Sequence, residues 1–190
     1  MKTTTETEPI VHAETPLPAP QGIGMAVAFD WGLSAQMLAT PIIALILRRS
    51  IPFGPTSQES GANVLLQYIF LVPAAALFAV FGEAIRRGVK LARPIQVVAN
   101  SLGALGGIAS AYSLYQSSRQ GNYWGAVASV ILLIFSPLIV WRLSRPATRR
   151  WFEQVSSAEA RRRHGGAWPW LIGIWAAVGG ILQAISTFQR

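Results

Sequence analysis

The sequence predicts an all-α, polytopic integral membrane protein with about five transmembrane helices, and three observations support that class. Of the 190 residues, 52% are hydrophobic and only 13% are charged, about half the charged share of a soluble domain. The hydrophobic residues gather in five stretches, each near the roughly 20 residues that a hydrocarbon core of about 30 Å requires of a helix. Lys and Arg lie between these stretches rather than within them.

The chain divides into an N-terminal tail and a single helical membrane domain. Residues 1–21 mix threonine, glutamate and proline with few large apolar groups, which predicts a disordered acidic, Pro-rich tail. Residues 22–190 form the membrane domain. Spans are expected at residues 22–47, 62–82, 94–115, 122–141 and 168–188. Prolines inside these spans are expected to kink them, with the freed carbonyl groups satisfied by neighbouring helices: Pro41, Pro73 and Pro137.

The distribution of Lys and Arg predicts the orientation, because cytoplasmic loops carry an excess of both residues. With the N-terminus inside, twelve of the sixteen Lys and Arg residues fall on the cytoplasmic side. We therefore expect a multi-pass protein of a bacterial inner membrane, with the N-terminus and main basic loops cytoplasmic and the C-terminus outside. The first span is the weakest point, since a segment 22–47 that only lay on the surface would move the tail across the membrane.

Small residues recur on the third and fifth spans. Glycine weakens a helix in water by roughly 1 kcal/mol per residue, whereas in a bilayer small-xxx-small faces let two helix backbones approach closely. On the third span the small residues are Ala99, Gly103, Gly106, Gly107 and Ala111. On the fifth span they are Gly173, Ala176, Ala177, Gly180 and Ala184. We expect each set to pack against a helix of the same chain, another transmembrane subunit or a second copy.

Asp30 is the one acidic residue inside an apolar stretch, and an ionisable group at membrane depth is by default a candidate functional residue. Its role depends on where the first helix begins. A helix beginning at Gly22 places Asp30 about 12 Å along the axis, as a proton or cation site. A helix beginning at Trp31 makes Asp30 its N-cap. We favour the N-cap.

Four amide side chains also lie within the spans, where we expect them to bond between helices rather than bind a solute. They are Gln36, Gln67, Asn100 and Gln183. His12 and His164 lie outside the spans, so no histidine stands at membrane depth to ligate haem or chlorophyll. The chain has no cysteine, and no phosphate loop or catalytic triad is visible. We expect no catalytic residues, no metal and no cofactor except lipid; a pigment held by an amide, water or carbonyl stays open.

The segment 142–166 carries the densest charge. A helix over 147–163 places Trp151 and Phe152 on one apolar stripe, with arginines elsewhere on its surface. Such a helix would lie at the cytoplasmic interface, with each arginine near anionic headgroups contributing roughly 1 kcal/mol. The residues predicted at this membrane surface are Arg149, Arg150, Trp151, Phe152, Arg161, Arg162 and Arg163. Because the positive-inside rule accounts for the arginines, we expect lipid rather than nucleic acid as their partner.

Residues 83–152 resemble a recurring hairpin of small uncharacterised bacterial multi-span membrane proteins. In those hairpins a basic opener with glycine and an alanine–arginine pair leads into two spans. A cytoplasmic ending of the Arg-Pro-x-x-Arg type and an aromatic residue follow. Here the opener is RRGVKLARP and the ending is SRPATRRWF. The resemblance covers about a third of the chain and implies a membrane hairpin but no activity.

These observations favour a non-catalytic accessory or structural subunit of a bacterial inner-membrane complex, which acts through helix packing and a basic cytoplasmic surface. The alternative is a small oligomeric transporter or channel that uses Asp30 and the amides of the spans. The two hypotheses differ in where the polar groups point. One shared internal cavity favours transport, and scattered contact or lipid-facing positions favour the structural subunit.

Overall fold

The computed structural model describes residue 20, residues 22–47 and residues 61–189, without the side chains of residues 61–67. Most of the predicted tail and the side chain of Gln67 therefore lie outside the described residues. The regular structure of the described ranges is helical throughout. Within those ranges, five helical segments are long and apolar enough to cross a membrane, which confirms the all-α class and the expected number of candidate spans.

Four of these segments are continuous α-helices, and the fifth is interrupted by a π-helix. The continuous helices are α1 (Ile23–Leu47), α2 (Gly61–Arg86), α3 (Ala92–Ser118) and α8 (Trp168–Thr187). The interrupted segment consists of α4 (Gly125–Val130), η1 (Ile131–Phe135) and α5 (Ser136–Ser144). Two shorter helices, α6 (Pro146–Gln154) and α7 (Ser157–Arg163), lie between α5 and α8.

The π-helix η1 has a local cause in Pro137. Proline has no N–H, so the usual hydrogen bond back to the carbonyl of Leu133 is missing. The preceding N–H, that of Ser136, reaches instead to the carbonyl of Ile131, five residues back. This wider turn is the geometry of a π-bulge, which is often found at functional sites.

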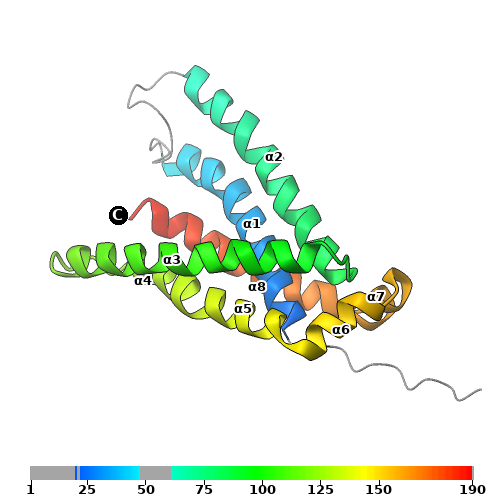
Figure 1. The fold of residues 1–190 in the computed structure, drawn as a ribbon. Coiled ribbons are helices and arrows are strands. Elements are labelled where there is room, and N and C mark those ends of the chain that lie inside the picture. Colours follow the sequence, from blue (N-terminus) through cyan, green and yellow to red (C-terminus); the bar gives the residue numbers. More distant parts are fainter. Residues whose placement is uncertain (1–19, 21, 48–60, 190) are drawn as a thin grey trace, which may run out of the picture.

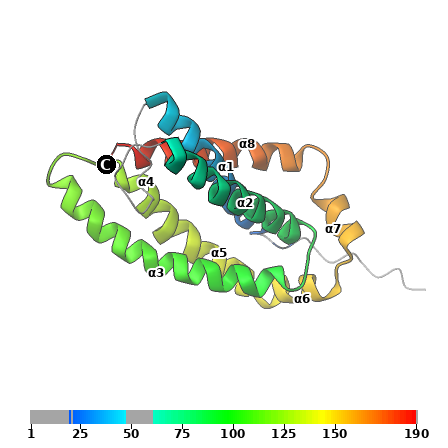
Figure 2. The same cartoon turned by 90° about the horizontal axis from the view of Figure 1, so that it is seen from above.

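The long segments pack as two layers. α1 lies between α2 and α8, and α3 packs along α4, η1 and α5. Figure 2 shows α2, α1 and α8 in one layer and α3 with the α4–α5 segment in the other. Successive long segments run in opposite directions, so the first residues of α1, α3 and α8 meet the last residues of α2 and α5 at one end of the bundle (Figure 1).

We call this end the basic end, because it carries every Lys and Arg of the described residues except Arg119. Arginines connect the helices here. Arg86 donates to Glu83 at 2.6 and 2.7 Å and to the carbonyl of His164 at 2.9 Å. Arg93 donates from Nε to the carbonyl of Leu143 at 2.8 Å. The end of α2 is thereby joined to the segment before α8, and α3 to α5.

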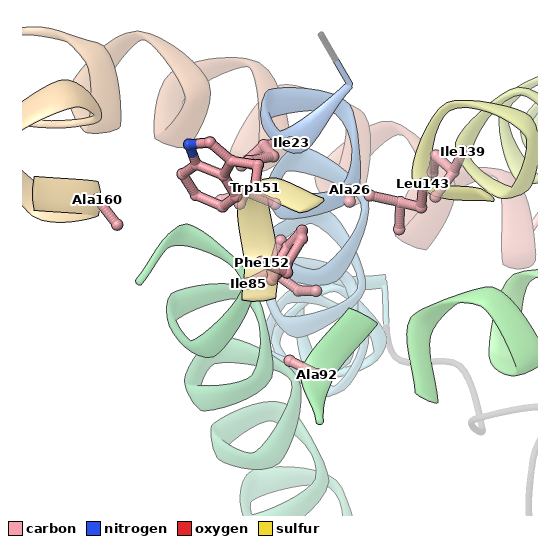
Figure 3. Close-up of a cluster of buried hydrophobic side chains, with 10 residues drawn as sticks. Ile23, Ala26, Ile85, Ala92, Ile139, Leu143, Trp151, Phe152 and Ala160 are labelled. Atoms are coloured by element: carbon pink, nitrogen blue, oxygen red, sulfur yellow. The ribbon is translucent and has the colours of Figure 1, made fainter. Parts of the chain in front are cut away.

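A hydrophobic cluster fills the basic end. Trp151 and Phe152 of α6 are 1% and 2% exposed and meet edge to face at 5.0 Å between ring centroids. They pack with buried side chains from α1, α2, α3 and α5 (Figure 3). We call this group the basic-end cluster; its larger members are Ile23, Ile85, Ile139, Leu143, Trp151 and Phe152.

The prediction of one interfacial helix over 147–163 is therefore wrong in two respects. The segment forms two helices, because Val155 and Ser156 are extended and the Ser156 hydroxyl caps α7 by accepting the N–H of Glu159 at 3.2 Å. Trp151 and Phe152 face the interior of the bundle rather than a membrane surface. The apolar stripe of an amphipathic helix can be buried either against its own chain or against lipid. The periodicity of the sequence is the same in both cases, so it does not show which surface the stripe covers.

Candidate functional site

Asp30 lies in the interior of α1, seven residues or about 10 Å beyond its first residue. The favoured N-cap assignment is therefore wrong, because the helix continues through this position and its unpaired N–H groups lie at Ile23 and the following turn. The carboxyl group is 2% exposed. Gln96 of α3 donates from Nε2 to Oδ1 at 3.0 Å. Oδ2 has no hydrogen-bond partner among the described residues.

A glycine on α2 permits this burial. A Cβ at Gly82 would lie 3.2 Å from the Cβ of Asp30 and 2.7 Å from the Trp31 ring. The Trp31 indole N–H donates to the carbonyl of Ala79 at 3.3 Å, which holds the ring against the same stretch of α2. The missing side chain at Gly82 thus lets the two helix backbones approach closely beside Asp30.

One face of α3 is polar or small along most of the helix. Its members follow alternating steps of four and three residues, which keeps them on one side. They are Gln96, Asn100, Gly103, Gly107, Ser110, Leu114 and Ser117. We call them the inner face of α3, because each is buried or half-buried. The distance along the axis from Gln96 to Ser117 is about 32 Å.

The opposite face of α3 is exposed and mainly apolar, although it includes the polar side chain of Gln116. It carries Ile95, Val98, Leu102, Leu105, Ile108, Tyr112 and Tyr115, each more than half exposed. A surface helix of a soluble protein has the reverse arrangement, with apolar side chains toward the core and polar side chains toward water. α3 is thus a helix with its polar face inside.

Several oxygens along the inner face lack partners. Asn100 donates from Nδ2 to the carbonyl of Gln96 at 3.0 Å, but its Oδ1 accepts nothing from the described residues. The hydroxyl of Ser136 on α5 is likewise buried without a partner, and a Cβ at Gly103 would lie 3.2 Å from it. Buried polar atoms are usually hydrogen-bonded. The unpartnered oxygens of Asp30, Asn100 and Ser136 therefore stand out as a set from three helices.

The π-helix narrows the middle of the inner face. A Cβ at Gly107 would lie 3.0 Å from both the carbonyl carbon and the Cβ of Leu132 in η1. Beyond this contact, Ser110 and Ser129 are hydrogen-bonded to each other at 3.0 Å between their hydroxyl oxygens. We call the contact between Gly107 and Leu132 the constriction.

A cavity of about 540 Å³ lies at the end of the bundle opposite the basic end. Most of its lining residues have polar side chains, although apolar atoms make up much of its surface, and we call it the polar cavity. Leu33 and Leu132 lie among its lining residues, so the cavity reaches the constriction. The polar lining includes Gln36, Ser110, Ser113, Ser117, Gln183 and Thr187. Gln36 and Gln183 therefore share one cavity. Asp30 and Asn100 are not among its lining residues: Asp30 accepts from the side chain of Gln96, and Asn100 donates to the backbone carbonyl of Gln96. These intramembrane candidates are buried or half-buried at two different levels of the bundle.

The small residues of the third span divide between the two faces of α3. Gly107 is buried and Gly103 half-buried, both against the α4–α5 segment, and Ala111 is half-buried. Ala99 and Gly106 are exposed, and a Cβ at Gly106 would meet nothing within 4 Å.

The small residues of the fifth span face α1 more uniformly. A Cβ at Gly180 would overlap the carbonyl oxygen of Gly32, so this is where the backbones of α8 and α1 approach most closely. Gly173 lies beside the Trp31 ring, at 3.9 Å from a Cβ position, and Ala177 is half-buried. The buried stripe itself consists of Ala176, Gly180 and Ala184.

The predicted surface arginines lie on α6 and α7. Arg149, Arg150, Arg161 and Arg162 are exposed, and Arg163 is half-buried. Arg163 and Arg162 lie 2.6 and 2.9 Å from the carboxylate of Glu159. Their hydrogen bonds hold the pKa of Glu159 below its usual value.

Two features bear on bound groups. Among the described residues, no three His, Cys, Asp or Glu side chains lie close enough to hold a metal ion. A second groove of about 430 Å³, almost wholly apolar, lies between α1, η1, α5 and α8 and is lined by Met25, Phe29, Ile139 and Trp175 among others. Its chemistry suits a hydrocarbon chain.

Sequence reasoning missed Gln96 and Ser136, which complete the site around Asp30 and Asn100. Gln96 lies within the expected third span, four residues before Asn100, and this spacing places both amides on one helix face. The four-residue spacing of Gln96 and Asn100 could therefore have identified Gln96 as a candidate from the sequence. Ser136 gave none, because a serine beside a proline is common at a helix boundary.

Comparison with protein families, characterised proteins and solved structures found no match to this chain. The resemblance of residues 83–152 to bacterial membrane hairpins therefore stays an expectation.

Proposed function

We propose that the chain is a transport protein of a bacterial inner membrane, which moves a small polar or cationic species along the inner face of α3. The observation that carries this proposal is the reversed polarity of α3. In a bilayer, buried polar groups are costly and tend to mark substrate or ion pathways. The inner face is about 32 Å long, which matches the thickness of the hydrocarbon core. Its glycines and hydroxyl groups also suit helix packing, but packing does not require the unpartnered oxygens of Asp30, Asn100 and Ser136.

The path is closed at two places in this conformation. The constriction separates the polar cavity from Asn100 and Asp30, and the basic-end cluster lies one helical turn beyond Gln96, at Ala92. We infer that the unpartnered oxygens of Asp30, Asn100 and Ser136 lie between these two closures, as an occluded state of an alternating-access transporter would require. This arrangement supports a gated transporter over a permanently open pore.

The orientation belongs to the same proposal. Positive charge at the basic end supports a cytoplasmic location for that end; the polar cavity would then open to the outside, and the C-terminus would be external. A reporter fused after Arg190 is expected to show an external location. A cytoplasmic location of the reporter would mean that the protein has the opposite orientation, with the polar cavity facing the cytoplasm.

The transport proposal is tested by reconstituting the purified chain in lipid vesicles. We expect at least one of protons, Na⁺, K⁺, urea or glycerol to cross faster than in protein-free vesicles. Leu132→Ala, which removes the side chain at the constriction, is expected to raise that rate severalfold. Leu102→Ala is the matched control, because Leu102 is 63% exposed on the outer face of α3. Rates equal to those of protein-free vesicles for all five species would refute the function.

A role as an accessory subunit is the second candidate, and the outer face of α3 favours it. Ala99 and Gly106 leave bare backbone among exposed apolar side chains, a surface on which a helix of another subunit or of a second copy can pack closely. Anionic headgroups would then bind the exposed arginines of α6 and α7. Gly106→Leu should release a co-purifying subunit in gentle detergent without unfolding the bundle, and unchanged association would refute this role.

A further inference from the structure

We propose that the species carried is the proton and that Oδ2 of Asp30 is the atom that binds it, an inference that rests on the transport function proposed above. Three observations of the structure lead to it: the half-satisfied carboxyl group, the charges around it, and the number and spacing of the oxygens nearby.

The carboxyl group of Asp30 is buried with one oxygen satisfied and one free. Oδ1 accepts from Gln96 and Oδ2 has no partner among the described residues. An isolated buried carboxylate is very costly, so the group has to be neutralised by a proton or a bound cation.

The charged groups on the surrounding helices do not neutralise it. Arg86, the last residue of α2, and Arg87, which follows it, bind Glu83 of α2 at 2.6 Å, and Arg93 of α3 binds the carbonyl of Leu143. Arg142 of α5 lies with its guanidinium 4.9 Å from the Trp141 ring centroid. α1 and α8 carry no other charged residue within their bounds.

The oxygens near Asp30 are too few and too widely spaced for a metal cation. A dehydrated divalent cation takes about six or more oxygen ligands, and Na⁺ sites of transporters draw on the carbonyls of unwound helices. Here α1 and α3 are unbroken at Asp30 and Gln96, so their carbonyls are used within the helices. The unpartnered side-chain oxygens follow α3 from the level of Gln96 to that of Gly103, about 10 Å, which suits a proton moving between acceptors.

The step transfers one proton. A hydronium ion that enters through the polar cavity gives its proton to Oδ2 of Asp30: one O–H bond of the hydronium ion breaks and leaves water, an O–H bond forms at Oδ2, and the carboxylate charge goes from −1 to 0. The neutral carboxylic acid is a hydrogen-bond donor, and Oδ1 of Asn100, one turn along the inner face from Gln96, is a buried acceptor without a donor. Release breaks the same O–H bond once the basic-end cluster has separated and water enters from that side: a water molecule takes the proton as hydronium, and Asp30 returns to the carboxylate.

Asp30 is the only aspartate in the chain, which permits a direct measurement. Protein labelled with ¹³C-aspartate and reconstituted in vesicles is examined by infrared difference spectroscopy. We expect an isotope-shifted band of a protonated carboxyl group that exchanges with the carboxylate band as the pH is changed. An isotope-shifted signal that stays carboxylate at every pH would overturn the inference, and this readout does not depend on transport or on any variant.

Flux through vesicles gives the second measurement, with valinomycin and a K⁺ gradient to set the voltage and trapped pyranine to report internal pH. We expect protein-dependent, voltage-driven acidification that Asp30→Asn reduces to the protein-free rate and Asp30→Glu partly retains. Glu153→Gln is the control, because the Glu153 carboxylate is exposed on α6, and it is expected to leave the flux unchanged. Elution and thermal unfolding of each variant in detergent verify its fold.

The outcomes separate the two proposals. Wild-type flux in folded Asp30→Asn would overturn the proton assignment, and so would passage of Na⁺, K⁺, urea or glycerol without passage of protons; in the latter case the transport function stands. Vesicles that pass none of these species would refute both.

Discussion

The two ends of the bundle differ in the polarity of the side chains that fill their interior. At the basic end, which carries nearly all the Lys and Arg residues of the described chain, Trp151 and Phe152 of α6 fill the interior together with apolar side chains from α1, α2, α3, α5 and α7. At the opposite end, serine and amide side chains of α1, α3 and α8 surround a cavity of about 540 Å³. The polar inner face of α3 runs from one end to the other. Under the proposed transport function, the two closures of the path are unequal: the constriction is a single contact between Gly107 and Leu132, whereas the basic end is filled by a hydrophobic cluster.

The largest effect is expected from opening the closed end. Trp151→Ala should lower the free energy of unfolding by about 3–5 kcal/mol, because it removes the largest fully buried side chain. Under the transport proposal it should also increase leakage through vesicles. The control is Trp175→Ala, since Trp175 is 72% exposed and its loss should change stability little. Equal melting temperatures for the two variants would show that the basic-end cluster does not hold this end together.

The second largest effect is expected at the contact between α1 and α8. Gly180→Ala should cost about 1–3 kcal/mol, because the added Cβ overlaps the carbonyl oxygen of Gly32 and forces the backbones apart. Gly179→Ala is the adjacent control, with nothing within 4 Å of its Cβ. Thermal unfolding in detergent compares them. Equal melting temperatures for Gly180→Ala and Gly179→Ala would show that the close approach of α1 and α8 at Gly180 does not contribute to stability.

A smaller change in the free energy of unfolding is expected at the constriction. Alanine at Gly107 and alanine at its neighbour Gly106 should change it in opposite directions. Gly107→Ala should destabilise by roughly 1 kcal/mol, because its Cβ would press on the backbone of Leu132 at 3.0 Å. Gly106→Ala faces open space and should stabilise α3 by about 0.5–1 kcal/mol through helix propensity. Denaturant titration of both variants provides the measurement. If Gly107→Ala raised the stability instead, the contact between Gly107 and Leu132 would have room for an additional methyl group.

The smallest effect is the pH dependence of stability that His164 contributes at the basic end. His164 lies with its ring 4.8 Å from Trp168 and 5.7 Å from Trp151 between centroids. Burial, and after it the positive charges of Arg86 and Arg163, lowers the pKa of His164 below its usual value of 6.5. The unfolded chain then binds the proton more readily, so the stabilisation is complete above about pH 6.5 and is lost as the pH falls through the folded-state pKa.

We therefore expect the melting temperature to fall between about pH 7 and pH 5, and to fall less in His164→Gln. An unchanged pH dependence in that variant would assign the effect to other groups.

Hydropathy was sufficient to predict the five candidate spans, because length and composition alone decide whether a helix can cross hydrocarbon. Helix ends were harder. The expected helix start at Trp31 was wrong by eight residues, since the apolar residues before Asp30 form helix as readily as those after it. The break at Val155 and Ser156 depends on a single serine cap, a local contact that an amphipathic pattern does not register.

The inner face of α3 was only partly predictable. A four-residue repeat of small residues indicated Ala99, Gly103, Gly107 and Ala111, but a helix face in contact with another helix follows alternating steps of three and four. The strict repeat therefore drifts off the contact, and Ala99 is exposed. The path itself depends on which helices are neighbours. Asp30 and Gln96 are 66 residues apart in sequence, and no local pattern brings them together.

The unequal lengths of the helices have a consequence for solvation. α3 has 27 residues and α8 has 20, so their axes are about 40 and 30 Å long. In a bilayer with a 30 Å hydrocarbon layer, the surplus of α3 has to tilt or project into the headgroup region. Tyr112 and Tyr115 are exposed near that end, where tyrosine favours the interface. The outermost turn of α3, with Ser117, would then stand among hydrated headgroups, and lipid composition would control how much water reaches the cavity.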